Sequence, residues 1–294
     1  MLTGRIIRTQ NSFFYVGTEQ GLIPCKLRGR FKKKSLVYPG DEVEIESLPD
    51  GSGVVERILE RRNLLKRPAV ANVDQVVLTF AAAQPEIHPL LLNRFLVLAE
   101  SSSIPRILLC VNKMDLRPPS DEEILSDYEK IGYPVLRVSA RKNLGIEALR
   151  RILAGRTTVF AGPSGVGKSS LLNRLDDTLH LAMGKVSEKI KRGRHTTRLA
   201  QLIPHEGGFI VDTPGFSSVE MGEMDARELA GCFPDFAPYL GACRFSPCTH
   251  SHEPQCSVRE AAEAGRILRE RYEAYLNLLD EIEKRKKECA WSSR

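Results

Sequence analysis

The sequence predicts a mostly parallel α/β domain, preceded by a small all-β barrel and followed by an α-helical, metal-binding domain. Three observations support this fold class. The first 60 residues contain short strand patterns between turn residues, residues 73–212 alternate strand and helix patterns, and Cys and His cluster between 243 and 256. Alternation of strands and helices favours a parallel sheet with helices on both faces. We expect domains at 1–65, 66–222 and 223–294.

The composition is that of a soluble globular protein. The 294 residues are 42% hydrophobic and 27% charged. An apolar run of about 18 residues is missing from the sequence, so we expect no membrane partner. The N-terminus lacks the apolar core of a signal peptide, which predicts a cytoplasmic chain, with a monomer as the default state. The net charge is +6, and residues 1–68 hold thirteen Lys/Arg against eight Asp/Glu, which favours a polyanionic partner for this segment.

Residues 1–60 predict four or five short strands. The stretches are GRIIRTQNSFFYVGT, GLIPCKLRG, DEVEIESL and GSGVVERIL, with Gly, Pro and Asp between them. So many strands in so short a segment favour a closed OB-fold barrel. The loop RGRFKKK is either a solvated turn or an RNA contact. We favour the RNA contact, because an aromatic ring among cations suits stacked bases and phosphates, and we expect it to involve Arg28, Arg30, Phe31, Lys32, Lys33 and Lys34.

The central region alternates between two kinds of element. Strands are predicted at 73–82, 105–112, 134–140, 156–161, 199–204 and 207–212, and helices at 88–101, 121–132, 143–153 and 170–175. The helix at 121–132 opens with acidic residues, which stabilise a helix N-terminus. Beyond the sheet, residues 225–236 predict a short helix. Residues 258–288 contain few helix breakers and predict one long terminal helix.

A phosphate-binding loop is predicted at 162–169, where GPSGVGKS matches G-x-x-x-x-G-K-[ST] between a strand and a helix. A glycine-rich turn of this kind directs several backbone N–H groups into one concavity, which suits phosphate. Lys168 is expected to reach the β- and γ-phosphates, Ser169 to bind Mg²⁺ and Ser170 to lie near the α-phosphate. The complete predicted set is Gly162, Pro163, Ser164, Gly165, Val166, Gly167, Lys168, Ser169 and Ser170.

The quartet NKMD at 112–115 predicts that the nucleotide base is guanine. A carboxylate at Asp115 offers two acceptors to the ring N–H and exocyclic amine of guanine, a pairing that adenine cannot supply. Asn112 would tie its loop to the base or to the phosphate loop, and the stem of Lys113 would lie over the ring. In VSA at 138–140, Ala140 would donate its N–H to the guanine carbonyl. The expected base-binding residues are Asn112, Lys113, Met114, Asp115, Ser139 and Ala140.

The segment DTPG at 212–215 follows the last strand of the predicted sheet. Asp212 is expected to hold a water molecule of the Mg²⁺ shell, and Gly215 to bring its N–H to the γ-phosphate. The polar, basic segment 185–198 suits a switch loop in which Thr196 or Thr197 binds the magnesium. The sequence leaves the choice between the two threonines open.

The residue that positions the attacking water is not the usual glutamine. Many GTPases carry a Gln directly after Asp-x-x-Gly, whereas this chain has Phe216, which neither donates nor accepts. His195 is the polar alternative in the switch loop, and a neutral imidazole can orient water near pH 7. The other interpretation is that His195 contacts RNA or packs the loop.

A zinc site is predicted in CRFSPCTHSHEPQC at 243–256. Cys243, Cys248, His250 and Cys256 supply three thiolates and an imidazole, the closed tetrahedral set of a structural zinc. His252 is a rival ligand on spacing alone. In a cytoplasmic chain, clustered Cys and His favour a metal over disulfides.

The motifs occur in an unusual order, because the base-reading quartet precedes the phosphate loop. With this order, GRHTT and the C-terminal Cys/His spacing, the sequence resembles the ribosome small subunit-dependent GTPase A family of circularly permuted bacterial GTPases over essentially the whole chain. The resemblance favours His250 as zinc ligand and supports His195 as the catalytic residue.

The resemblance also implies an activity and partners. These are GTP hydrolysis to GDP stimulated by the small (30S) ribosomal subunit, contact with 16S rRNA, and release of the protein from the subunit late in its maturation. Two alternatives are a non-catalytic, nucleotide-dependent RNA-docking regulator and a translation factor on assembled ribosomes.

Overall fold

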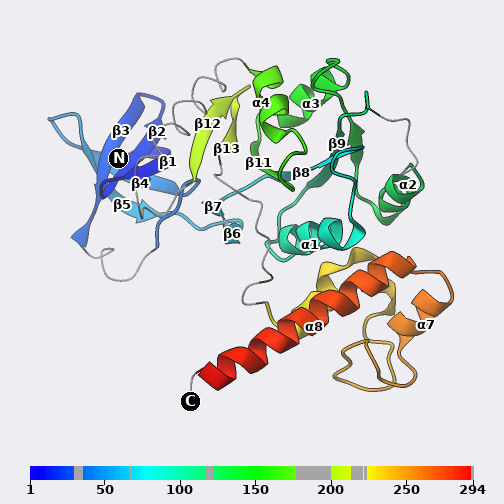
Figure 1. Ribbon diagram of the computed structural model, residues 1–294. Helices are drawn as coiled ribbons and strands as arrows, with labels where there is room; N and C mark the ends of the chain where they lie inside the picture. Colours follow the sequence, from blue (N-terminus) through cyan, green and yellow to red (C-terminus); the bar gives the residue numbers. More distant parts are fainter. Residues whose placement is uncertain are drawn as a thin grey trace.

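The computed structural model describes residues 1–29, 36–66, 68–116, 122–176, 200–212, 221 and 224–292. In Figure 1 the N-terminal barrel lies beside a central sheet, and a helical module lies below the sheet, against helix α1. None of the helices in the described ranges has the length and apolar character needed to cross a membrane.

The N-terminal region is a closed five-stranded barrel with strand order β1-β2-β3-β5-β4. Its strands are β1 (Leu2–Gln10), β2 (Phe13–Thr18), β3 (Gly21–Leu27), β4 (Glu42–Ser47) and β5 (Gly53–Ile58). Strand β4 closes the barrel against β1, and β3 runs parallel to β5. The fully buried residues Ile6, Val16, Cys25, Val43, Ile45 and Val55 fill its interior. The prediction of an OB-like barrel is therefore confirmed.

A short hairpin of β6 (Leu64–Lys66) and β7 (Ala69–Ala71) connects the barrel to the sheet. Beyond it, the Asp74 carboxylate accepts hydrogen bonds from the Thr157 N–H at 2.8 Å and from Arg62 at 2.7 Å. Arg5 of β1 donates to the Thr157 hydroxyl at 2.9 Å. Arg5 of the barrel and Asp74, which directly precedes β8 (Gln75–Ala81), thus both contact Thr157, the first residue of β11 (Thr157–Ala161), the strand that leads into the phosphate loop.

The central sheet has six strands in the order β10-β9-β8-β11-β13-β12. They are β8 (Gln75–Ala81), β9 (Ile107–Asn112), β10 (Val135–Arg137), β11, β12 (Gln201–His205) and β13 (Gly208–Asp212). All neighbouring pairs are parallel except β12 with β13, which form a hairpin. The mostly parallel sheet is therefore confirmed.

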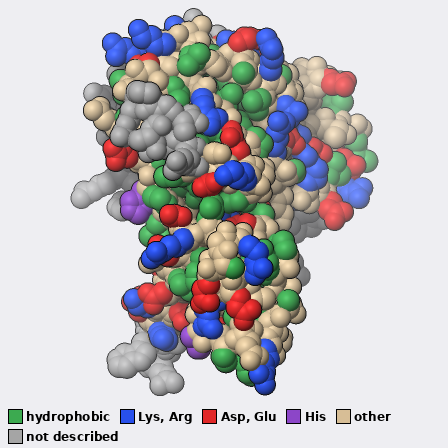
Figure 2. Space-filling view, turned by 90° about the vertical axis from the view of Figure 1, so that its right-hand side faces the viewer, with side chains coloured by type: hydrophobic (Ala, Val, Ile, Leu, Met, Phe, Trp, Pro, Cys, Tyr) green, Lys and Arg blue, Asp and Glu red, His purple; other side chains and the backbone are tan. Residues whose placement is uncertain are grey.

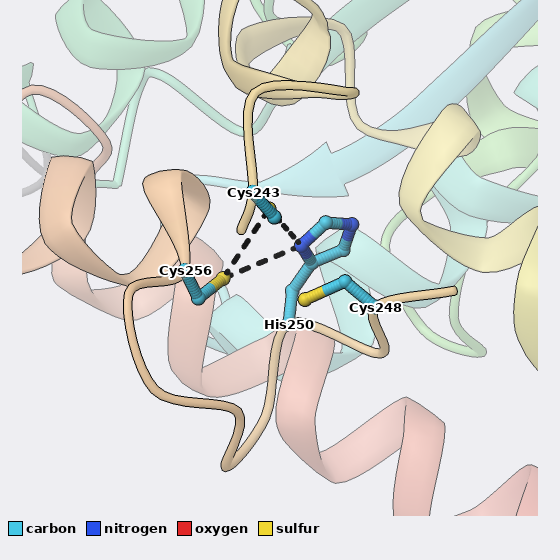
Figure 3. A group of neighbouring side chains, drawn as sticks. All are labelled: Cys243, Cys248, His250 and Cys256. Carbon is cyan, nitrogen blue, oxygen red and sulfur yellow. Dashed lines mark hydrogen bonds between the residues drawn. The ribbon is translucent and has the colours of Figure 1, made fainter. Parts of the chain in front are cut away.

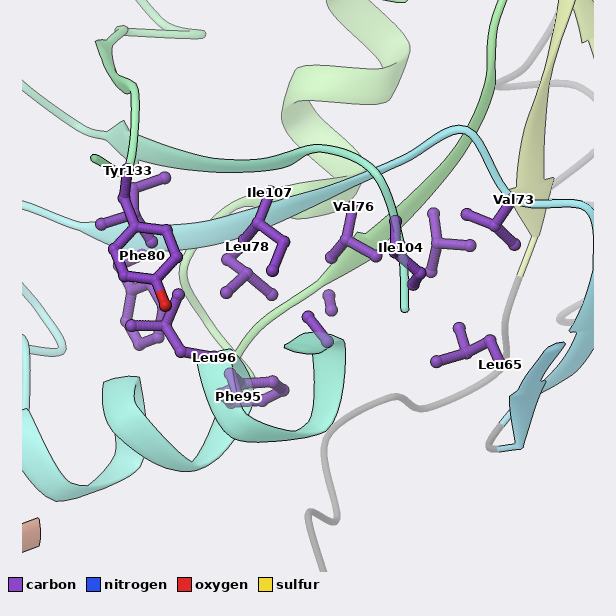
Figure 4. Close-up of a cluster of buried hydrophobic side chains, with 14 of the residues drawn as sticks. Leu65, Val73, Val76, Leu78, Phe80, Phe95, Leu96, Ile104, Ile107 and Tyr133 are labelled. Carbon is purple, nitrogen blue, oxygen red and sulfur yellow. The ribbon is translucent and has the colours of Figure 1, made fainter. Parts of the chain in front are cut away.

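Helices cover both faces of the sheet because the side chains of buried strands alternate between two cores. On one face, Val76, Leu78 and Phe80 of β8 pack against α1 (Pro89–Glu100) and α2 (Glu122–Ile131), as Figure 4 shows for part of this core. On the other face, Val77 of β8 and Phe160 of β11 pack against α3 (Ile146–Leu153) and α4 (Lys168–Leu175). Alternate residues of each strand point to opposite faces, and both faces are covered, so most residues of the buried strands are apolar and the sequence shows nearly continuous apolar runs.

The C-terminal module contains α6 (Ala226–Leu229), the 3₁₀ segments η2 (Ala230–Cys232) and η3 (Pro234–Tyr239), α7 (Ser257–Glu263) and α8 (Arg269–Ser292). The prediction of one helix over 258–288 is wrong, because the chain turns between α7 and α8. Gly265 has a φ of +69°, and the N–H groups of Arg266 and Ile267 bond back to the carbonyl of Ala261. A glycine adopts this left-handed conformation without steric cost, so a single residue ends the first helix.

Leu78 provides a test of the core that supports the nucleotide-binding edge. It is fully buried in β8, so Leu78→Ala should lower the free energy of unfolding by about 2–5 kcal/mol through lost burial and a residual cavity. Leu22→Ala is the matched control, since Leu22 of β3 is 51% exposed and its truncation should change stability by less than about 0.5 kcal/mol. Urea denaturation followed by circular dichroism measures both. Equal losses would contradict the assignment of this core.

Candidate nucleotide site and metal centre

The predicted nucleotide-binding motifs meet at one edge of the sheet. Strands β9, β11 and β13 are parallel and end at Asn112, Ala161 and Asp212, and β10 ends two residues before Ser139. The carboxyl ends of parallel strands face the same side, and the loops that follow them form the usual ligand crevice of an open α/β sheet. The order of the motifs along the chain therefore does not prevent their convergence.

The phosphate loop, residues 162–169, is held close to its neighbours by glycines. Gly162 has a φ of +139°, and a Cβ there would lie 2.0 Å from the carbonyl oxygen of Thr79. Gly167 has a φ of +92°, and a Cβ would lie 2.4 Å from the side-chain nitrogen of Asn112. Any larger residue at either position would push the loop away from β8 or β9. The turn then leads directly into the N-terminus of α4.

Lys168 lies over this loop. Its Nζ donates to the carbonyl oxygens of Gly162 and Pro163, both at 2.7 Å, and burial lowers the pKa of its ammonium group. The next two residues, Ser169 and Ser170, are exposed on the first turn of α4, whereas Val166 is buried beneath the loop. An ammonium group and two exposed serines thus lie at this turn.

Asn112 joins the phosphate loop to the base-reading loops. Its side-chain amide donates to the carbonyl oxygen of Val166 at 3.0 Å, and its carbonyl accepts the N–H of Ala140 at 3.1 Å. The residue is only 2% exposed, so these bonds form away from bulk water. Of the two roles that the sequence left open for Asn112, the structure contains the link to the phosphate loop.

Asp115 is oriented by Ser139. The Ser139 hydroxyl donates to the Asp115 carboxylate at 2.5 Å and accepts the N–H of Lys142 at 3.0 Å. The hydrogen bond from Ser139 lowers the pKa of Asp115, with smaller contributions from the cations Arg141 and Lys142. The carboxylate is therefore ionised and fixed in direction at neutral pH. Ser139, predicted as a base-binding residue, here has the further role of holding Asp115.

Lys113 and Met114 complete this loop. Lys113 has a φ of +63°, and its ammonium group donates to the carbonyl oxygen of Gln84 in the loop after β8. The Met114 N–H bonds to Val138, and its side chain packs against the sheet core. The sequence did not point to Gln84, because the contact uses its backbone carbonyl and leaves no side-chain pattern to detect.

Several predicted site residues lie outside the described residues or are placed only by their backbone. The residues outside the described ranges are His195, Thr196, Thr197 and Gly215. Asp212 is the last residue of β13, where its backbone is paired with Gln201.

Of the predicted RNA-contact residues, the structure describes only Arg28. Arg28 is exposed and pairs with Glu56, and the remaining residues of the set, Arg30 to Lys34, lie outside the described residues. The structure contains two cation–aromatic pairs on the barrel that the sequence did not reveal: Arg8 lies over Tyr15 at 4.4 Å, and Lys26 over Phe13 at 5.1 Å. The run FFY at residues 13–15 of β2 is the sequence pattern that could have indicated these aromatic contacts. On the face away from the barrel, basic and acidic side chains are interspersed (Figure 2).

The predicted metal ligands converge in the C-terminal module. The ligand atoms of Cys243, Cys248, His250 and Cys256 all lie within 4.8 Å of one another (Figure 3). The His250 Nδ1 lies 3.4 Å from the sulfurs of Cys243 and Cys256, which are 3.9 Å apart. A tetrahedron with bonds of about 2.3 Å has edges of about 3.8 Å, so one metal ion fits between these atoms. The rival, His252, is exposed and bonds to Ser251.

Helix α8 holds the loop that carries the metal ligands. Tyr272 donates to the carbonyl oxygen of His250 at 2.7 Å, and Tyr275 donates to that of Thr249 at 2.5 Å. The Cys256 sulfur also caps α7 by accepting the Arg259 N–H at 3.5 Å. With four protein ligands and these supports, the centre has the character of a structural site.

Comparison with known proteins agrees with this geometry. The family model "RsgA GTPase" matches residues 58–222, and "RsgA N-terminal domain" matches residues 3–55. The chain is 45% identical to the small ribosomal subunit biogenesis GTPase RsgA of Clostridium beijerinckii over 284 residues, 96% of this chain and 97% of that protein. It is 44% identical to the protein of the same name from Alkaliphilus metalliredigens, covering 98% of this chain and all of that one.

Solved structures show the same architecture. YjeQ from Thermotoga maritima superposes with a TM-score of 0.81 at 38% identity, covering 96% of this chain and 98% of that one. YloQ, described as a circularly permuted GTPase, superposes with a TM-score of 0.80 at 37% identity, covering 97% and 96%. The fold class predicted from the sequence is thereby confirmed, including the permutation. From its phosphate loop, its base-reading loops and these matches, the chain belongs to the RsgA GTPase family.

Proposed function

We propose that this chain is a GTP hydrolase that acts in the biogenesis of the small ribosomal subunit. The observation that carries the proposal is the Asp115 carboxylate, which Ser139 holds in direction beside the loop that Asn112 ties to the phosphate loop. Family membership supports it as well, because relatives that are 44–45% identical over nearly the full chain bear this function in their names.

Guanine recognition follows from the orientation of Asp115. Its two oxygens would accept the ring N–H and the exocyclic amine of guanine in a charge-assisted, bidentate pairing. Because Ser139 already restrains the carboxylate, little conformational freedom remains to be lost when the base binds. Lys113, held by the Gln84 carbonyl, would place its aliphatic stem against the face of the ring. Ala140 would share its N–H between Asn112 and the guanine carbonyl.

The triphosphate would bind across the phosphate loop. Lys168 would exchange the two loop carbonyls for the β- and γ-phosphates, with which its positive charge pairs more strongly. Ser169, which is exposed at the start of α4, would hold Mg²⁺ together with Thr196 or Thr197, and Asp212 would bind one of its water molecules. When bound, the metal neutralises charge on the phosphates.

Hydrolysis would depend on His195, which we propose as the residue that orients the attacking water. The side chain after Gly215 is Phe216, which cannot perform this role. A neutral imidazole can both donate to and accept from water near pH 7. Gly215 would sense the γ-phosphate through its N–H, so that cleavage changes the segment that leads toward the C-terminal module.

We assign recognition of 16S rRNA to the barrel and propose a cytoplasmic monomer that binds the 30S particle. The exposed Arg28, the neighbouring basic loop and the cation–aromatic pairs of Arg8 with Tyr15 and Lys26 with Phe13 support this assignment. Unpaired RNA bases stack on aromatic rings, while cations bind the phosphates. Through Arg5 and Thr157 the barrel contacts the strand before the phosphate loop, so hydrolysis and release from RNA could be linked.

The metal is proposed to be one structural Zn²⁺. Three sulfurs and an imidazole nitrogen with separations of 3.4 and 3.9 Å suit tetrahedral zinc, and these four ligands complete its preferred coordination. The ion would hold together a loop that has few buried apolar side chains of its own.

The identity of the base is tested by Asp115→Asn. The amide presents one donor and one acceptor, so the affinity for GDP should fall at least about tenfold, from the loss of a charged hydrogen bond of about 1.5–3 kcal/mol. Xanthine nucleotides should bind better, because xanthine has a carbonyl where guanine has its amine. Isothermal titration with GDP and xanthosine diphosphate measures both, with Asp280→Asn, an exposed pair with Lys284, as control. Unaltered purine preference would refute the site.

The activity is tested by GTP turnover with purified 30S, 50S and 70S particles at two salt concentrations. We expect strong stimulation by 30S that weakens as salt rises, because phosphate contacts are screened. His195→Ala should abolish stimulation by 30S while leaving GDP affinity unchanged. The control variant, His252→Ala, should still be stimulated by 30S. Stimulation by 70S alone would favour a translation factor, and no turnover with any particle would favour a non-catalytic regulator. Full activity of His195→Ala would show that another group positions the water.

The metal is tested by elemental analysis of Cys248→Ala. The wild-type chain should contain one zinc ion, and the variant should contain almost none and melt at a lower temperature, since metal binding contributes to folding. Cys289→Ser is the control, because Cys289 is exposed on α8 and outside the cluster. Purified wild-type protein without zinc but with the same melting temperature would contradict a structural metal.

A further inference from the structure

Helix α8 carries a buried arginine that neither the nucleotide site nor the metal centre uses directly. Arg271 is fully buried and donates through Nε and Nη2 to the Asp235 carboxylate, the Nε bond being 3.2 Å. Its Nη1 donates to the side-chain carbonyl of Asn93 in α1 at 2.7 Å. The guanidinium group also lies 4.6 Å from the ring centre of Phe233. One charged group therefore joins the C-terminal module to the central domain.

The same group reaches the segment that separates the two base-reading loops. Arg271 lies 5.8 Å from the ring of Tyr128 at the end of α2 and 5.9 Å from that of Tyr133, two residues before β10. Asn93, which accepts from Arg271, donates in turn to the Tyr128 hydroxyl at 2.9 Å. Asp115 precedes α2 and Ser139 follows β10, so this segment lies in the sequence between the carboxylate and the serine that orients it.

The other neighbours of Arg271 on α8 hold the metal loop. Tyr272 and Tyr275, one and four residues later, donate to the backbone carbonyls of His250 and Thr249. The ring of Tyr275 packs edge-on against Phe233 and Phe236, whose side chains are fully buried. Within one turn, α8 thus contacts the metal ligands on one side and the α2–β10 segment on the other.

We propose that Arg271 is a positioning residue for guanine recognition, through which the metal centre stabilises the arrangement of Asp115 and Ser139. The proposal rests on the proposed GTP site. Loss of the metal should loosen the loop that anchors α8, shift Arg271 and weaken guanine binding. Coupling between sites is reciprocal, so a bound guanine nucleotide should in turn slow the loss of zinc. The usual size of such coupling is about 5- to 150-fold in affinity.

Two conservative variants test the connection. Tyr128→Phe removes only the hydroxyl that bonds to Asn93, and Arg271→Lys keeps the charge but loses the forked set of donors. Glu281→Gln is the matched control. Glu281 of α8 pairs with Arg94 of α1, so its substitution weakens another α1–α8 contact, one that does not involve the α2–β10 segment. Thermal melting establishes that each variant is folded.

The decisive readout is the ratio of affinities for GDP and inosine diphosphate, measured by titration. Inosine lacks the exocyclic amine that Asp115 recognises, so a misplaced carboxylate lowers this ratio, whereas a general loss of stability lowers both affinities together. We expect the ratio to fall about fivefold or more in Tyr128→Phe and Arg271→Lys and to stay at the wild-type value in Glu281→Gln. A wild-type ratio in both test variants would overturn the proposal.

Zinc release provides the second readout. With a chromogenic chelator, saturating GDP should slow the release of zinc from the wild-type chain at least about fivefold, and this protection should disappear in Arg271→Lys. Release that is independent of GDP in the wild type would overturn the coupling. If instead the wild-type protein does not distinguish GDP from inosine diphosphate, the proposed guanine site itself has failed, which is a different result from preserved selectivity in the variants.

Discussion

The nucleotide site depends on one buried side chain, Asn112, which binds the phosphate loop through its amide and Ala140 through its carbonyl. These two bonds connect three loops that are far apart in the sequence. Because the residue is almost fully buried, breaking either bond would leave a polar group without a partner, a costly condition in the protein interior. The spacing between the base-reading and phosphate-binding parts of the site is thereby maintained.

The permuted order of the motifs has consequences for the neighbouring domains. A parallel sheet presents all its strand ends at one edge, so the site can form whatever the order of connection. The chain ends, however, leave the sheet at different places from those of an unpermuted GTPase. Here the barrel contacts the start of β11 through Arg5, and the C-terminal module packs on α1 through α8. One flanking domain therefore contacts the strand that leads into the phosphate loop, and the other packs on a helix that covers the sheet.

The C-terminal module combines a candidate metal centre with a buried ion pair, and both contact α8. The module has a buried apolar core that includes Phe233, Phe236 and Tyr275, and the pair of Arg271 with Asp235 lies beside it. A buried arginine is tolerated because its N–H groups donate to a carboxylate and an amide carbonyl, and its guanidinium group lies over the ring of Phe233. The same contacts give the module a defined position against the central domain.

The sequence by itself determined the fold class, the proposed guanine-reading and phosphate-binding motifs and the three cysteines of the candidate metal site, because glycine turns, Cys spacing and two-residue periodicity are local patterns. Spacing left the choice between His250 and His252 open, and the structure brings His250 to the three cysteines. The sequence did not reveal the break at Gly265, since a single left-handed residue overrides an otherwise helical composition. Only the tertiary structure decided that Ser139 holds Asp115, that Gln84 holds Lys113 and that Arg271 lies between α1 and α2. These contacts join residues 24 to 178 positions apart, and they form only where strand ends and packed helices bring distant side chains together.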